Sequence, residues 1–192
     1  MAPSFCIDIN ESEQGQLLGI ARRSIESGLA GGSWLQPGNE NLAGSLSIRL
    51  GAFVTLTRYE VLRGCIGSLE STDPLAQAVA NSAFKAAFSD SRFAPLEAAE
   101  IEDTRIKISV LSKLEPLAAI SRADLLDRLR PGEDGLLLQD RGHRATFLPG
   151  VWDKISDPEE FLGQLLVKAG LSGDYWSESI SFKRYRAFSF GE

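Results

Sequence analysis

The stretch GAFVTLTRYEVLRGCIGSLE, residues 51–70, is the most informative part of the chain. Residues 52–57 alternate between the two faces of an expected strand, Arg58-Tyr59-Glu60 forms a short turn, and residues 61–68 return as a second strand. This pattern predicts a β-hairpin. Cys65 lies on its second arm between two glycines, and a glycine inside a strand often marks a bulge or a close approach of the backbone.

Helical patterns lie on both sides of this hairpin. Apolar residues recur at three- and four-residue steps over Ser12–Leu29, which predicts a helix with one buried face. Asp73-Pro74 predicts a second helix start, with the aspartate as cap and the proline at the first helical position. Ser121 and Asp157-Pro158 predict the starts of two more helices by the same reasoning.

The remaining strand patterns are separated from one another by helices. Thr104–Leu111 alternates as a half-buried strand, and residues 135–139 and 144–148 flank a turn that contains His143. Ser179–Phe190 reads as one long alternating segment that is interrupted by Arg184 and Arg186. Strands in hairpins with about four helices between them predict an α+β fold with antiparallel sheet, not a doubly wound parallel fold.

Composition narrows the classes of function. The chain has 192 residues, of which 43% are hydrophobic and 24% charged, so it is long enough to bury a core. Its net charge of -6 disfavours nucleic-acid binding driven by phosphate contacts, and it disfavours docking on anionic lipid. The longest apolar runs are far too short for a membrane span, and a cytoplasmic location is expected.

The few cysteines and the single histidine argue against a disulfide framework and against a zinc site. Cys6 and Cys65 are expected to be reduced thiols, and His143 is expected in an exposed turn. With one histidine and no Cys-x-x-Cys pair, no metal site is predicted. The sequence does not indicate a cofactor.

Six blocks of sequence resemble the AMMECR family in order and spacing. From about Glu11 to Phe190 the chain is similar to one complete AMMECR-type domain, and residues 62–67, Leu-Arg-Gly-Cys-Ile-Gly, are similar to the signature of the family. The matching blocks are residues 51–56, 62–68, 86–93, 108–112, 147–149 with Trp152, and 161–162 with 168–171.

The resemblance implies a domain over residues 11–190 that is made of two subdomains, with the signature near a cleft between them. It also implies association with a Memo-like protein and a radical S-adenosylmethionine (radical SAM) protein, as in the AmmeMemoRadiSam set. It does not imply a reaction, because the activity of the family is unsettled.

Cys65 is the leading candidate for chemistry. It is expected to act as a nucleophile or thiol donor, and Arg63 is expected to favour the reactive thiolate and to bind an anionic group. On a regular strand the two side chains point to the same face. The alternatives are that Cys65 is a buried packing residue between glycines and that Arg63 forms a structural ion pair.

Further residues are expected to complete the site. Asp90, as an orienter or base, and Arg92 follow the second helix and are predicted to complete a polar cleft, the alternative being a local ion pair at a helix end. The predicted ligand-binding residues are Gly64, Gly67, Ser68, Thr55 and Arg92.

Three functional hypotheses remain open. The first is an enzyme or enzyme subunit that acts on a small anionic metabolite, with Cys65 and Arg63 at its centre. The second is a non-catalytic partner subunit for the Memo-like and radical SAM proteins. The third is a regulator linked to nucleic acid, which the negative net charge disfavours.

Overall fold

The structure is a computed structural model that describes residues 9–38 and 44–192, so Cys6 lies outside the described residues. The chain divides into two compact units. The first contains the chain up to Ser112 together with Phe188–Glu192, and the second contains Lys113–Ala187. The predicted cleft between the two subdomains stays a prediction.

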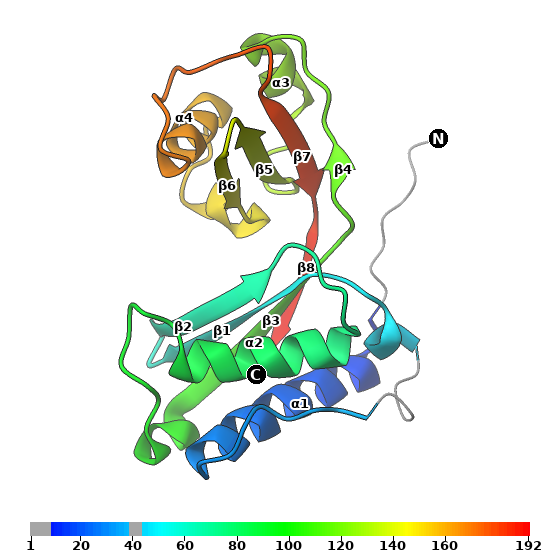
Figure 1. Cartoon of the computed structure of the whole chain (residues 1–192), viewed down its shortest axis with the longest axis vertical. Coiled ribbons are helices and arrows are strands. Elements are labelled where there is room, and N and C mark those ends of the chain that lie inside the picture. Colours follow the sequence, from blue (N-terminus) through cyan, green and yellow to red (C-terminus); the bar gives the residue numbers. More distant parts are fainter. Residues whose placement is uncertain (1–8, 39–43) are drawn as a thin grey trace. The chain divides into compact units, whose positions relative to one another are not determined.

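The first unit is a four-stranded sheet with two long helices on one face (Figure 1). The strand order is β2-β1-β3-β8, so that β2 and β8 are the edges. In chain order the elements are α1 (Glu11–Leu29), the 3₁₀ segment η2 (Gly44–Ser47), β1 (Ala52–Arg58), β2 (Val61–Ser68), α2 (Leu75–Phe88), the 3₁₀ segment η3 (Ala98–Asp103), β3 (Thr104–Leu111) and β8 (Ala187–Gly191).

Alternation along β1 and β3 separates the two faces of this sheet. Val54 and Leu56 of β1, and Ile106 and Ile108 of β3, are buried in the core with residues of α1 and α2. The intervening residues therefore point to the other face, which we call the outer face. On β1 and β3 the outer face carries mostly polar side chains: Phe53, Thr55, Thr57, Arg105, Lys107 and Ser109.

The second unit has its own sheet and its own core. The strand order is β4-β7-β5-β6, and Trp152 stacks on Phe161 with ring centroids 3.8 Å apart. Its elements are β4 (Glu115–Pro116), α3 (Arg122–Arg128), β5 (Gly135–Asp140), β6 (His143–Phe147), the 3₁₀ segment η4 (Pro149–Asp153), α4 (Pro158–Lys168) and β7 (Ser181–Tyr185). The predicted α+β fold with antiparallel sheets is therefore confirmed.

The predicted helix caps at Ser121 and Asp157 are confirmed, and α1 also begins at a side-chain cap. Asn10 caps α1 and accepts a hydrogen bond from the backbone N–H of Glu13 at 3.0 Å, and Asp157 caps α4. The predicted aspartate cap on α2 is wrong. Pro74 holds the N-cap position without a side-chain hydrogen bond, and the Asp73 backbone N–H bonds to Ser71 Oγ instead.

The prediction of one long strand over Ser179–Phe190 is also wrong. The segment forms two strands that belong to different sheets: Phe182 of β7 is buried in the second unit, whereas Phe188 and Phe190 of β8 pack on the core of the first. Arg186 lies between the strands and forms an ion pair with Glu133 at 2.6 Å. The alternating pattern continues through Arg186, although the sheet changes there.

In the part of the chain that the structure describes, no helix combines the length and the apolar character needed to cross a bilayer.

Candidate functional site

Three residues line up across the outer face of the first sheet. Thr55 of β1 is the register partner of Cys65 on β2 and of Lys107 on β3. The Cys65 Sγ lies 3.3 Å from Thr55 Oγ1, within hydrogen-bond distance for sulfur, and Cys65 is half-buried. We call Cys65, Thr55 and Lys107 the thiol row. It places a cysteine, a threonine and a lysine at neighbouring positions on one face of the sheet.

A bulge in β2 changes the expected relation between Arg63 and Cys65. The register shifts so that Leu56 pairs with Gly64 and Thr57 with Leu62, which leaves Arg63 without a partner on β1. The expectation that Arg63 and Cys65 share a face assumed a regular strand, and β2 is not regular here.

Arg63 is bound to the segment before β3. Its guanidinium donates to Glu100 at 2.8 and 2.9 Å and to the carbonyl oxygens of Ala94 and Pro95 at 2.9 and 3.2 Å. The hydrogen bond from Arg63 lowers the pKa of Glu100 to about 2. These contacts give Arg63 the structural ion pair that the sequence left open as the alternative.

Asp90 and Arg92 hold the backbone of Cys65. Asp90 Oδ2 accepts the Cys65 backbone N–H at 2.8 Å, and Arg92 donates to the Cys65 carbonyl oxygen at 3.3 Å and to Asp90 at 2.7 Å. Because β2 is an edge strand, these two side chains replace the missing neighbouring strand at this residue.

The same contacts decide what Asp90 can do chemically. The hydrogen bond from Arg92, followed by the bond from the Cys65 backbone, keeps the pKa of the buried Asp90 far below its usual range. A carboxylate with such a low pKa is a weak base. Its hydrogen bond to the Cys65 backbone suits it instead to positioning Cys65.

The two glycines beside Cys65 allow close packing. A Cβ atom on Gly64 would lie 2.1 Å from the carbonyl oxygen of Ala86, so α2 packs directly against the backbone of β2. A Cβ atom on Gly67 would lie 2.5 Å from Cγ of the Phe53 ring. Both are the close approaches expected of glycine inside a strand.

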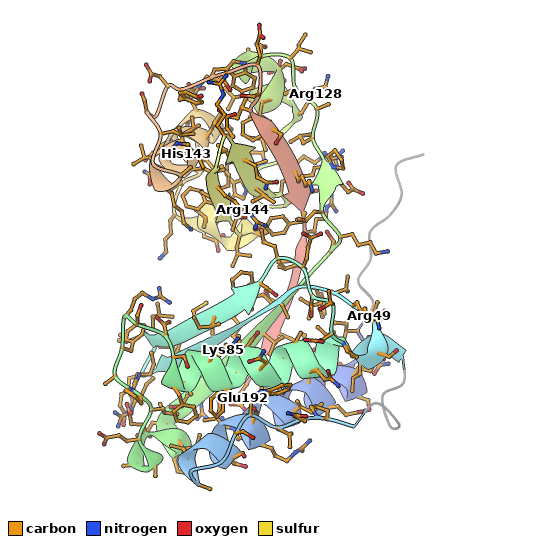
Figure 2. The ribbon with its side chains drawn as sticks, viewed as in Figure 1. Arg49, Lys85, Arg128, His143, Arg144 and Glu192 are labelled. Atoms are coloured by element: carbon orange, nitrogen blue, oxygen red, sulfur yellow. The ribbon has the colours of Figure 1, made fainter. Side chains whose placement is uncertain are left out.

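Gly67 and Ser68 line a groove that does not contain the thiol. This open groove of about 600 Å³ lies between the end of β2 and α2, and it is also lined by Glu70, Asp73 and Lys85. Lys85 is labelled on α2 in Figure 2. With two carboxylates against one ammonium group, the groove does not suit an anionic ligand.

The turn between β1 and β2 presents apolar side chains to solvent. Tyr59 and Glu60 both have positive φ, at 52° and 62°, as a two-residue turn of this hairpin requires. Tyr59 is 70% exposed and Val61 is 68% exposed, while the Tyr59 hydroxyl donates to Asp103 at 2.6 Å. We call Tyr59, Val61 and the partly exposed Leu62 the hairpin tip.

His143 has a structural partner at the end of a helix. It lies on β6 (Figure 2), and its Nδ1 donates to the carbonyl oxygen of Ala169, the C-cap of α4, at 2.8 Å. No group of three or more His, Cys, Asp and Glu side chains that could hold a metal ion occurs in residues 9–38 and 44–192.

Lys107 is the member of the thiol row that sequence reasoning missed. The alternation of residues 104–111 already places Arg105, Lys107 and Ser109 on one face. It does not reveal that Lys107 pairs with Thr55, because that register joins strands about 50 residues apart in the chain.

Comparisons with known proteins agree on the family of this chain. The AMMECR1 family model matches residues 18–190. A protein of Thermofilum pendens is 36% identical, with 94% of this chain and 91% of that protein covered, and a protein of Methanothermobacter thermautotrophicus is 37% identical, with 96% of each covered. A crystal structure of an uncharacterised protein from Pyrococcus horikoshii superposes with a TM-score of 0.83 at 33% identity, covering 92% of this chain and 89% of that one.

Proposed function

This chain belongs to the AMMECR1 family, and we propose that its thiol row binds a small anionic metabolite, with Cys65 as the reacting group of an enzyme or enzyme subunit. Cys65 is the nucleophile, Thr55 hydrogen-bonds to it, and Asp90 and Arg92 are positioning residues. The family signature, residues 62–67, contributes the thiol and the two glycines that allow its backbone to pack closely.

The observation that carries this proposal is the contact of 3.3 Å between Cys65 Sγ and Thr55 Oγ1 on the outer face. A hydroxyl that donates to sulfur stabilises the thiolate, which is the nucleophilic form of cysteine. The backbone of Cys65 is fixed by two charged side chains, so the sulfur is held at a defined place. Defined placement of a reacting atom is a large part of what an active site contributes.

Alkylation of the native protein tests this proposal. We expect iodoacetamide to modify Cys65 under native conditions, at a rate that rises with pH and differs from that of the unfolded chain. Thr55→Val removes the hydroxyl but keeps the size of the side chain, so we expect it to slow the reaction severalfold. Peptide mass mapping distinguishes modification of Cys65 from modification of Cys6. The Cys65→Ser variant gives the background level of alkylation.

Two outcomes contradict the proposal. A Cys65 that does not react in the native state is a packing residue. A Cys65 that reacts like a thiol in the unfolded chain, with no effect of Thr55→Val, has no activation by its surroundings.

A second candidate function is supported by the hairpin tip. Exposed apolar side chains that lie together often mark a protein interface, and Tyr59 and Val61 are both mostly exposed. This favours a non-catalytic partner subunit for a Memo-like and a radical SAM protein. Copurification with those proteins that survives Cys65→Ser but is lost in Val61→Asp supports the partner role over the enzymatic one.

A further inference from the structure

We propose that Lys107, and not Arg63, supplies the positive charge that holds the anionic group of the ligand beside Cys65. This inference builds on the proposed function of the thiol row and assigns its anion-binding residue. The ligand class is a small molecule with a carboxylate or phosphate group.

The two arginines that contact the segment around Cys65, Arg63 and Arg92, already donate to groups of this chain. Arg63 donates to Glu100 and to two carbonyl oxygens, and Arg92 donates to Asp90 and to the Cys65 carbonyl. Lys107 is exposed, and among the described residues it has neither a hydrogen-bond partner nor an ion-pair partner. Its three N–H donors are therefore available to a ligand.

The register sets the distance between Lys107 and the thiol. Adjacent strands lie about 4.8 Å apart, so the backbones of β2 and β3 are about 10 Å apart at the thiol row. The four-carbon stem of a lysine spans much of that distance. An anion placed over Thr55, in the middle of the row, lies within reach of Lys107 and next to Cys65.

The surroundings of Lys107 favour an anion. On the side away from Thr55 lies Gly191 of β8, whose missing side chain leaves room: a Cβ there would lie 3.5 Å from the Lys107 Cβ. Along the same face Ser109 Oγ and Ser189 Oγ are 2.8 Å apart and add hydroxyl donors. Within β1 and β3 the neighbouring outer-face residues include Arg105 and no acidic side chain, and Arg105 interacts electrostatically with Asp103, which precedes β3.

A pair of alkylating reagents tests this assignment. Iodoacetate and iodoacetamide have the same leaving group, but only iodoacetate carries a carboxylate. We expect the ratio of the Cys65 rate with iodoacetate to that with iodoacetamide to be higher in the native protein than in the unfolded chain. Lys107→Met is expected to lower this ratio about threefold, because one charge at this range is worth a factor of that size.

Control variants separate a local effect from a change of net charge. Lys107→Arg keeps the charge and is expected to keep the ratio. Lys85→Met removes a lysine from α2, which packs on the opposite face of the sheet, and is expected to leave the ratio unchanged. At high salt, the ratio of the two alkylation rates is expected to become the same in the parent protein and in Lys107→Met.

Titration with inorganic phosphate gives a readout that does not need a reactive thiol. We expect phosphate to shift the amide resonances of Thr55 and Lys107 in NMR spectra of the unmodified protein but not of Lys107→Met. If phosphate binds but Cys65 is inert, the proposed anion site at Lys107 stands and the proposed role of the thiol is wrong. A reactive Cys65 whose ratio is unaffected by Lys107→Met, or equally affected by Lys85→Met, overturns the assignment of Lys107.

Discussion

A missing methyl group decides how closely α2 packs on β2. At Gly64 the carbonyl oxygen of Ala86 occupies the place that a Cβ atom would take, at 2.1 Å from it. Any side chain at this position forces α2 and β2 apart, and the hydrogen bonds that hold Cys65 depend on the loop that follows α2. Gly64 is therefore required by packing, whatever role the neighbouring thiol has.

Replacement of Gly64 by alanine is expected to destabilise the protein by about 3 kcal/mol, because overpacking against a backbone carbonyl cannot be relieved by a side-chain movement. Gly15→Ala is the matched control, since an added Cβ there meets no atom within 4 Å and α1 gains helix propensity. Urea unfolding measures both. A Gly64→Ala protein as stable as the control contradicts the packing seen between α2 and β2.

At the scale of the element, β2 is an edge strand that is held by two pairs of opposite charge. Asp90 with Arg92 binds the backbone of Cys65, and Glu100 with Arg63 binds the bulge. Edge strands are open to unwanted pairing, and charged side chains on the edge prevent it. In this chain the same charges also position the signature segment.

Because of these two ion pairs, the first unit is expected to lose stability at acidic pH. The pKa of Glu100 falls from 4.5 to about 2 on folding, and that of Asp90 is also lowered. A lowered folded-state pKa gives stability that is complete above the unfolded-state value and lost as pH falls toward the folded-state value. We therefore expect the free energy of unfolding to decrease as the pH falls below about 4.5.

Glu100→Gln is expected to flatten this decrease and to lower the stability at pH 7. Glu26→Gln, at an exposed carboxyl on α1, should leave the curve unchanged. Urea unfolding at several pH values between 7 and 2.5 measures the effect. A Glu100→Gln protein with the pH dependence of the parent would show that the Arg63 pair contributes nothing to folding.

At the scale of the whole molecule, the chain builds two cores, and its last strands divide between them. Phe182 belongs to the second core, whereas Phe188 and Phe190 pack on the first. The second core includes the stacked pair of Trp152 and Phe161. A mutation in one core is therefore expected to destabilise mainly the unit that contains it.

Phe161→Ala is expected to cost about 3–5 kcal/mol, the usual effect of removing a buried aromatic side chain. Hydrogen exchange measured by mass spectrometry should show faster exchange in β5, β6 and β7, while β1 and β3 keep their protection. Equal acceleration in both sheets would mean that the two units unfold as one.

The sequence by itself determined the local structure. The capped helices α1 and α4, the hairpin of β1 and β2, and the alternating burial of β3 all follow from periodicity and from turn and cap residues. These features depend on interactions between residues close together in the chain, which is why a pattern of a few residues predicts them. The resemblance of residues 62–67 to the family signature was also visible at this level.

Only the tertiary structure decided which residues contact one another across the chain. Three findings depend on strand register and on contacts over tens of residues. Arg63 binds Glu100, the segment after Ser179 divides between two sheets, and Lys107 lies in the thiol row. Periodicity states which face a side chain occupies, but it cannot state what lies opposite, because that is set by how distant strands pair. The candidate site combines both levels: the sequence indicated the thiol, and the fold placed a lysine in its row.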